Sequence, residues 1–280
     1  MRARIAILSL ALICTTMASA QTSGKSPFGS HFTPPSHVVI VMEENHSYQD
    51  IIGSPLAPYI NSLAQTGASF TNSFAISHPS LPNYLALFSG SDQGVTDDFC
   101  PRTFSKPTLE SELIDAGKTF AGYSEGLPSA GSLVCKQDDY ARKHVPWTYF
   151  ANAPAADNLP FSNFPQNYDQ IPTISWVIPN LIDDMHDGTI QDADSWLKAN
   201  LSGYAEWAQT HDSLLIITWD EDDKNHGNQI PTIFVGGVIK QGQYAEKINH
   251  YSVLRTLEDM YSLPRLGASA GAKPITDVWK

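Results

Sequence analysis

An unbroken apolar run that ends in polar residues most constrains how this chain can fold. Residues 37–42 read His-Val-Val-Ile-Val-Met. Five consecutive apolar residues predict a strand buried on both faces, as in a parallel sheet covered by helices. Glu44 and Asn45 follow almost at once. Ligands of open α/β sheets bind past the carboxyl ends of strands, and carboxylate and amide oxygens suit a divalent cation. The pattern indicates a metal site, but a polar loop capping a strand would have the same sequence.

A second apolar run repeats this arrangement. Residues 213–219 are apolar and rich in strand-forming types, and Asp220-Glu221-Asp222-Asp223 follow directly. Adjacent acids repel one another unless a cation or solvent compensates their charge. A solvated acidic loop is the common explanation for such a run. Two strands that each end in oxygen donors favour metal binding over that explanation.

Strand and helix patterns alternate along the chain. Further strands are predicted at residues 119–124, 173–178 and 231–235. Helices are predicted at residues 57–66, 81–89, 108–116, 192–209 (with a break at 202–203) and 252–261. This alternation predicts a three-layer α/β/α sandwich with a mostly parallel central sheet, in one domain over residues 21–280. Residues 151–170, rich in Pro, Asn and Ala, either cover one side of a site or are surface padding.

The first 20 residues have the pattern of a signal peptide. Arg2 and Arg4 precede an apolar run, and Met17-Ala18-Ser19-Ala20 resembles a cleavage site. The apolar run is too short to span a bilayer, so we expect an exported chain, secreted or periplasmic, with no transmembrane segment. Apart from Cys14 in this leader, the cysteines are Cys100 and Cys135. In an exported protein such a pair predicts one disulfide.

The charge balance restricts the partners of the chain. It carries 17 basic and 29 acidic residues, for a formal net charge of −12. Such a balance disfavours nucleic-acid binding and a broad electrostatic hold on anionic membranes. An anionic substrate would need local cations. Arg142, Lys143 and His144 form the densest basic cluster; it suits a bound phosphate and equally suits a solvated surface.

Three further segments carry candidate site residues. Ser80 precedes an apolar helical run. The free amides and dipole of a helix N-terminus favour an anion, so a serine there suits attack on phosphorus, although a plain serine N-cap is very common. Asp184 and His186 follow the predicted strand at 173–178, and His250 precedes the last helix. We expect these segments to converge on one edge of the sheet.

These segments together resemble a known family. The matching stretches are VVIVMEENHSYQD (38–50), SHPSLPNYLALFSG (77–90), YARKHVPW (140–147), PNLIDDMHD (179–187), TWDEDD (218–223), IPTIFVG (230–236) and residues 249–261. The chain resembles the bacterial phosphoesterase family that groups acid phosphatases with phospholipase C enzymes. It is most similar to the small secreted acid phosphatases. The resemblance implies an alkaline-phosphatase-like fold.

The resemblance also implies roles for particular residues. Ser80 matches the family nucleophile, which becomes transiently phosphorylated. His144 and His186 match histidines that contact phosphate or assist proton transfer. Arg142 and Lys143 are the expected substrate-binding cations. The expected metal ligands are Glu44, Asn45, Asp220 and Glu221, with Asp184 and His250 as candidates for a second ion. The Asp220-Glu221 pair departs from the two aspartates of some relatives, which leaves the ligand geometry open.

The implied activity is a metal-dependent phosphomonoesterase of the acid phosphatase type. Oxygen ligands favour calcium, magnesium or manganese, while His186 and His250 are compatible with zinc. The expected substrate is a phosphate monoester, with a phospholipid headgroup among the candidates. Two alternatives stay open: a phosphodiesterase of the phospholipase C type, and an exported protein that binds an anion or metal without turnover.

Overall fold

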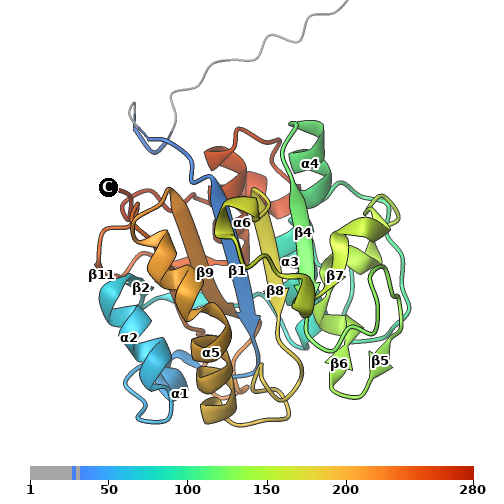
Figure 1. Ribbon diagram of the computed structural model, residues 1–280, viewed down its shortest axis with the longest axis horizontal. Coiled ribbons are helices and arrows are strands. Elements are labelled where there is room, and N and C mark those ends of the chain that lie inside the picture. The colour runs from blue at the N-terminus through green and yellow to red at the C-terminus, as the bar shows by residue number, and fades with distance from the viewer. Residues whose placement is uncertain (1–26, 30–31) are drawn as a thin grey trace, which may run out of the picture.

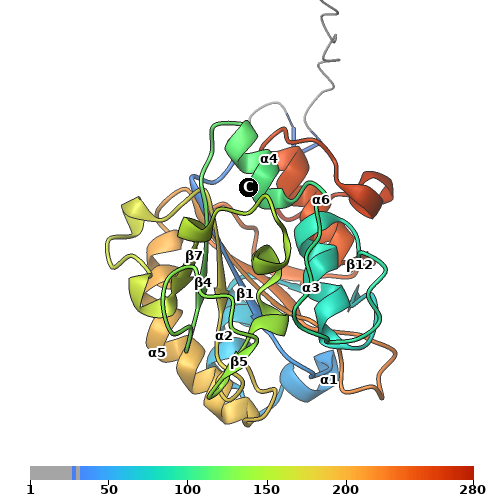
Figure 2. The ribbon, with the colours of Figure 1, turned by 90° about the vertical axis from the view of Figure 1, so that its right-hand side faces the viewer.

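The computed structural model describes residues 27–29 and 32–280. The predicted leader at residues 1–20 lies outside this part of the chain. The described residues form a central sheet with helices on both faces (Figures 1 and 2). Within these residues, no helix combines the length and apolar character needed to cross a membrane.

The main sheet is mostly parallel, as predicted. Across the described residues it has eight strands, in the order β11-β2-β10-β9-β1-β8-β4-β7. Their bounds are β1 His37–Glu43, β2 Ala68–Phe70, β4 Phe120–Ser124, β7 Asn158–Pro160, β8 Ile174–Ile178, β9 Ser213–Trp219, β10 Thr232–Val235 and β11 Gly242–Tyr244. β1 lies between β8 and β9 and runs parallel to both. β10 runs antiparallel to β9 and to β2, so one side of the sheet is mixed.

Helices cover both faces of this sheet. The α-helices are α1 Tyr48–Ile51, α2 Pro58–Thr66, α3 Ser80–Ser89, α4 Leu109–Asp115, α5 Ile190–Ala208 and α6 His250–Met260. In Figure 2 the sheet is seen nearly edge-on, with α5 on one side and α3 and α6 on the other. This arrangement confirms the predicted α/β/α layers.

The central strand shows why its sequence is apolar without interruption. Val38, Ile40 and Met42 pack into the core that contains residues of α3 and α6. Val39 and Val41 point to the opposite face and pack into the core of α2 and α5. Because successive side chains of a strand alternate between faces, a strand covered on both sides has to be apolar at every position.

The predicted break in the long helix is wrong. α5 is continuous through Ser202 and Gly203. Gly203 instead permits a close contact, because a Cβ there would lie 2.6 Å from the hydroxyl of Tyr168. The glycine therefore accommodates a neighbouring segment on the helix surface, and its cost in helix propensity is offset by packing.

Residues 151–170, here called the covering segment, contribute to the edge of the sheet. Their elements are β7 and the short 3₁₀ helices η3 Ala155–Asp157, η4 Phe161–Asn163 and η5 Tyr168–Gln170. β7 pairs in parallel with β4 and extends the sheet by one strand. Sequence patterns did not predict this three-residue strand, because it ends in a proline and lacks an apolar run.

Two short ladders and the remaining 3₁₀ helices lie in the connections. β5 (Lys136–Gln137) pairs with β6 (Tyr140–Ala141), and β3 (Ser73–Phe74) pairs with β12 (Ile248–Asn249). The 3₁₀ helices are η1 Arg142–His144, η2 Pro146–Tyr149 and η6 Gly267–Gly271. The predicted disulfide between Cys100 and Cys135 is present and ties the loop before α4 to the start of β5.

Candidate active site

The ends of β1 and β9 bring two carboxylates together. Glu43 and Trp219 are paired in register, so the residues that follow them emerge side by side. Glu44 and Asp220 are both fully buried there. The backbone N–H of Asn45 donates to Asp220 Oδ1 at 3.1 Å, and Asn45 adopts a positive φ of 53°, which asparagine tolerates better than most residues. The turn after β1 is therefore fixed to the end of β9.

Ser80 lies against these carboxylates. It is the first residue of α3, and its hydroxyl donates to Glu44 Oε2 at 3.2 Å. The same hydroxyl faces Asp220. Pro79 occupies the N-cap position, and no side-chain cap is formed. Of the two interpretations of Ser80, the structure therefore excludes the plain N-cap and directs the hydroxyl toward the acids.

Tyr84 supports the same carboxylate from the next turn of α3. Its hydroxyl donates to Glu44 Oε1 at 2.7 Å. Burial, followed by the charge of Glu44, raises the pKa of Tyr84 far above its usual value, so the phenol stays protonated and acts as a donor. Sequence reasoning missed this residue. Tyr84 lies four residues after Ser80 and therefore on the same face of the helix, and this spacing could have identified it as a site residue.

His144 connects Glu44 to Asp184. Its Nδ1 lies 3.1 Å from Asp184 Oδ2, and its Nε2 lies 2.9 Å from Glu44 Oε1. The Nε2 contact is an ion-pair distance without hydrogen-bond alignment. Burial alone disfavours the imidazolium, but Glu44 and Asp184 outweigh it and raise the pKa of His144 to about 9. The ring also stacks on Tyr84, with centroids 5.1 Å apart.

Lys143 and His186 lie next to each other at another side of the site. Lys143 Nζ lies 3.0 Å from His186 Nε2 and 3.1 Å from Asp98 Oδ2. Asp98 Oδ1 also accepts the backbone N–H of Leu81, the residue after Ser80. Asp98 thus joins the helix of Ser80 to Lys143. It was not predicted, because nothing in its local sequence separates it from an ordinary loop aspartate.

Arg142, the other predicted substrate-binding cation, points away from this group. Its guanidinium donates to the side chain and backbone of Thr148 and to the carbonyl of Leu133. It also lies over the ring of Tyr149, at 4.9 Å from the centroid. The buried arginine holds the backbone around η1 in place, and its neighbour Lys143 alone faces the acids.

The remaining predicted ligands lie around the end of β9. Glu221 Oε2 lies 3.1 Å from Nδ1 of His78 and 3.3 Å from Nδ2 of Asn83, so its carboxylate faces these side chains. His250 Nε2 lies 2.8 Å from the backbone carbonyl of Asp220. Burial lowers the pKa of His250 to about 4, so the neutral ring donates to that carbonyl and supports the strand end.

The donor set fits a divalent cation. Asp220 Oδ2 is buried without a hydrogen-bond partner. Burial and then the charges of Glu44 and Glu221 raise the pKa of Asp220 well above its usual value. Carboxylates held this close need a compensating positive charge. At this site the residues whose ligand atoms all lie within 4.8 Å of one another are Glu44, His144 and His186, and Asp220 and Glu221 do not belong to that group.

Comparisons with known families and solved structures identify the class of protein to which this fold and site belong. The Phosphoesterase family model matches residues 55–264, so the chain belongs to the Phosphoesterase family and is a hydrolase of phosphoric esters. A protein of the alkaline phosphatase superfamily from Vibrio parahaemolyticus superposes with a TM-score of 0.57 at 15% identity, covering 88% of this chain and 72% of the other. The zinc complex of the periplasmic domain of EptC from Escherichia coli gives 0.58 at 10% identity, covering 89% and 88%. These likenesses confirm the alkaline-phosphatase-like fold.

Two curated proteins of similar sequence are phosphatases by name. The chain is 54% identical to the phosphatidylinositol-3-phosphatase of Mycobacterium tuberculosis, over 87% of this chain and 83% of that protein. It is 31% identical to a probable acid phosphatase of Kluyveromyces lactis, over 85% of this chain. The chain spans 61% of the length of that yeast protein. The predicted resemblance to acid phosphatases of this family is confirmed.

Proposed function

We propose that the protein is an exported, metal-dependent phosphomonoesterase that works through a phosphoserine intermediate and accepts a phosphoinositide. The observation that carries this proposal is the position of Ser80. Its hydroxyl lies 3.2 Å from Glu44 Oε2, beside the unpartnered Oδ2 of Asp220. Lys143, on η1, is linked to the helix of Ser80 through Asp98, which accepts from both Lys143 Nζ and the backbone N–H of Leu81. A nucleophile between a metal-ligand set and a cation suits phosphoryl transfer.

The chain's own residues account for most of the first step. Ser80 gives up its hydroxyl proton to solvent as its Oγ attacks phosphorus in line, and the bond from phosphorus to the leaving oxygen breaks as the serine–phosphorus bond forms. Lys143 balances the negative charge that spreads over the phosphoryl oxygens. A divalent cation held by Glu44, Asn45, Asp220 and Glu221 would polarise the phosphoryl group and the serine hydroxyl when bound.

The two histidines take different parts in this scheme. Both ring nitrogens of His144 face carboxylates, so we assign it to positioning Glu44. His186 is more open, with a quarter of its side chain exposed, and lies beside Lys143. We assign His186 to protonation of the leaving oxygen. Water then attacks the phosphoserine, and phosphate and the free serine are released.

The class of substrate rests on the relatives. The 54%-identical protein is named for a phosphoinositide monoester, and the fungal relatives are named acid phosphatases. These names favour monoesters over the diesters of phospholipase C enzymes. Hydrolysis of p-nitrophenyl phosphate with no turnover of p-nitrophenyl phosphorylcholine is the expected result, and preference for the diester would reverse the assignment.

Substitution of the nucleophile tests the mechanism. Ser80→Ala should lower kcat by about three orders of magnitude or more while the protein stays folded. Ser89→Ala is the matched control, since Ser89 lies in the same helix but its hydroxyl donates to the carbonyls of Leu85 and Ser91. Acid-quenched wild-type enzyme should carry one phosphoryl group on Ser80. Near-normal turnover in Ser80→Ala would remove Ser80 from the mechanism.

A further inference from the structure

An open apolar cavity lies against η1, the 3₁₀ helix that carries Arg142, Lys143 and His144. Its volume is about 210 Å³. Its walls include the side chains of Leu133, Trp147, Phe150, Ala153 and Pro154. Most of these atoms are apolar, and the covering segment contributes part of the wall, including the exposed Pro154. It is separate from the acids around Ser80 described above.

The buried polar side chains that line this cavity already have partners. Arg142 donates to Thr148 and Leu133. Asn158 accepts from Trp147 Nε1 at 2.9 Å and donates to the carbonyl of Ser132 at 2.8 Å. Because these groups are engaged within the protein, the cavity presents mainly apolar surface to a guest. Its chemistry therefore suits a hydrocarbon better than a polar ligand.

The cavity and the phosphate-binding side of the site share one wall. Arg142 lines the cavity, and the next residue, Lys143, faces His186 and Asp98. Consecutive Cα atoms lie 3.8 Å apart, so one turn of backbone separates the two environments. A molecule with a phosphate at one end and a hydrocarbon at the other would find both environments on this turn.

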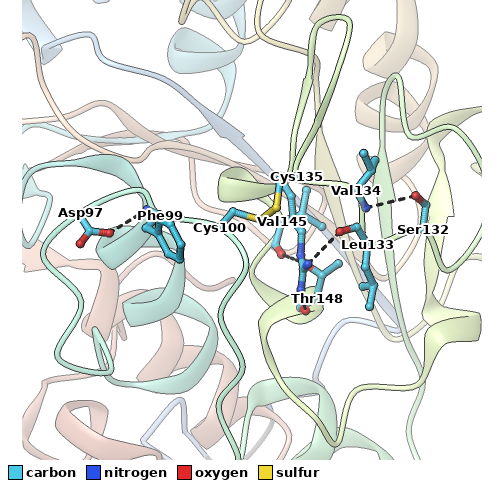
Figure 3. The surroundings of a disulfide bond; sticks show 10 residues. Asp97, Phe99, Cys100, Ser132, Leu133, Val134, Cys135, Val145 and Thr148 are labelled. Atoms are coloured by element: carbon cyan, nitrogen blue, oxygen red, sulfur yellow. Dashed lines mark hydrogen bonds between the residues drawn. A yellow bond between two sulfur atoms is a disulfide. The ribbon is translucent and has the colours of Figure 1, made fainter.

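Two exposed apolar side chains lie in the chain segments that adjoin the site and the cavity. Among the described residues, Phe99 (61% exposed) and Leu133 (57%) are the most exposed large hydrophobic residues. The Cys100–Cys135 disulfide joins their segments, and they flank it in Figure 3. Phe99 directly follows Asp98 of the site, and Leu133 lines the cavity. We call Phe99 and Leu133 the apolar rim.

We propose that the apolar rim and the cavity receive the acyl chain of a lipid-borne phosphate monoester whose phosphate lies at Ser80. This inference rests on the proposed phosphomonoesterase activity and specifies its substrate. The protein has a net negative charge, so an anionic bilayer would not attract it. The proposal does not need such attraction, because the apolar rim would bind the lipid by burying apolar surface. Covering one exposed Leu or Phe side chain is worth about tenfold or more in affinity.

Chain length of the substrate tests the proposal. The full protein is assayed on dipalmitoyl phosphatidylinositol 3-phosphate in phosphatidylcholine vesicles, on the soluble dibutanoyl form, and on p-nitrophenyl phosphate. The double variant Phe99→Ser/Leu133→Ser should lose about tenfold or more in kcat/KM on the dipalmitoyl lipid. It should stay within about twofold of wild type on the two soluble substrates.

A second variant probes the cavity without touching the rim. Ala153→Trp fills the cavity and should reproduce the selective loss on the dipalmitoyl lipid. Ile114→Ser is the matched control, because Ile114 is 42% exposed on α4, at the far end of the molecule from the site (Figure 1). It should leave all three activities unchanged.

The outcomes separate this inference from the function on which it rests. Equal losses on all three substrates, or no loss on any, would overturn the acyl-chain assignment. Wild-type turnover of p-nitrophenyl phosphate without turnover of either lipid would overturn it as well, together with the phosphoinositide part of the proposed function, while leaving the phosphomonoesterase activity intact. Failure on every monoester would overturn the proposed function itself.

Discussion

A buried carboxyl group that faces a partly exposed aspartate should make the stability of the fold depend on pH. Glu110, in the first turn of α4, is 1% exposed. It faces Asp157 of η3 in the covering segment. Burial, followed by the charge of Asp157, raises the pKa of Glu110 from 4.5 to about 9. The folded protein therefore keeps Glu110 protonated at neutral pH, whereas the unfolded chain releases that proton.

The sign and size of the effect follow from this difference. Below pH 4.5 both states hold the proton, and the contribution of Glu110 to stability is fully present. As pH rises toward about 9 the unfolded state binds fewer protons, so the free energy of unfolding falls. One proton is worth about 1.4 kcal/mol per pH unit, which gives up to about 4 kcal/mol between pH 5 and 8.

Glu110→Gln isolates this contribution. The amide has nearly the same shape and does not titrate in this range. The variant should match wild type within about 1 kcal/mol at pH 5 and exceed its stability by up to about 4 kcal/mol at pH 8. Urea unfolding at several pH values, with divalent cation held in excess, measures the difference. Glu206→Gln, at an exposed position of α5, is the control. A difference between Glu110→Gln and wild type that stays constant with pH would refute the reasoning.

Two further predictions concern the site. Asp98→Asn keeps an acceptor for the N–H of Leu81 but removes the negative charge opposite Lys143. Inorganic phosphate should therefore inhibit the variant about fivefold more tightly than wild type. An unchanged inhibition constant would show that Asp98 does not modulate Lys143. Chelation of divalent cations should abolish turnover and lower the Tm, because Glu44, Asp220 and Glu221 lose their compensating charge. Resupply at a hundredfold excess over Kd should restore about 2.7 kcal/mol of stability, and a Tm that ignores both treatments would argue against a cation at these acids.

The sequence predicts the sheet and much of the site for a shared physical reason. A strand buried on both faces has to be apolar throughout, so β1 and β9 stand out, and polar residues directly after them are visible as strand ends. The short strands β2, β7 and β11 carry no such signal, because three residues cannot show a period. Their positions depend on tertiary pairing.

The orientation of neighbouring side chains could not be read from the sequence. Arg142 and Lys143 have the same charge and lie in one 3₁₀ turn, yet one fixes the backbone and the other faces the acids. Asp98 and Ser80 are brought together by packing, 18 positions apart in the chain. Local pattern cannot specify such contacts, because they depend on how loops close over the finished sheet.

The disulfide has a consequence for when the enzyme becomes competent. Cys100–Cys135 fastens the segment that carries Asp98 to the start of the β5–β6 ladder, which leads into Lys143, across a sequence separation of 35 residues. With free thiols, as a reducing cytoplasm would keep them, these two segments would lose their covalent link and keep noncovalent contacts alone, among them the weak ion pair between Lys143 and Asp98. We expect the reduced chain to hydrolyse phosphate esters less efficiently than the chain in which this disulfide is formed.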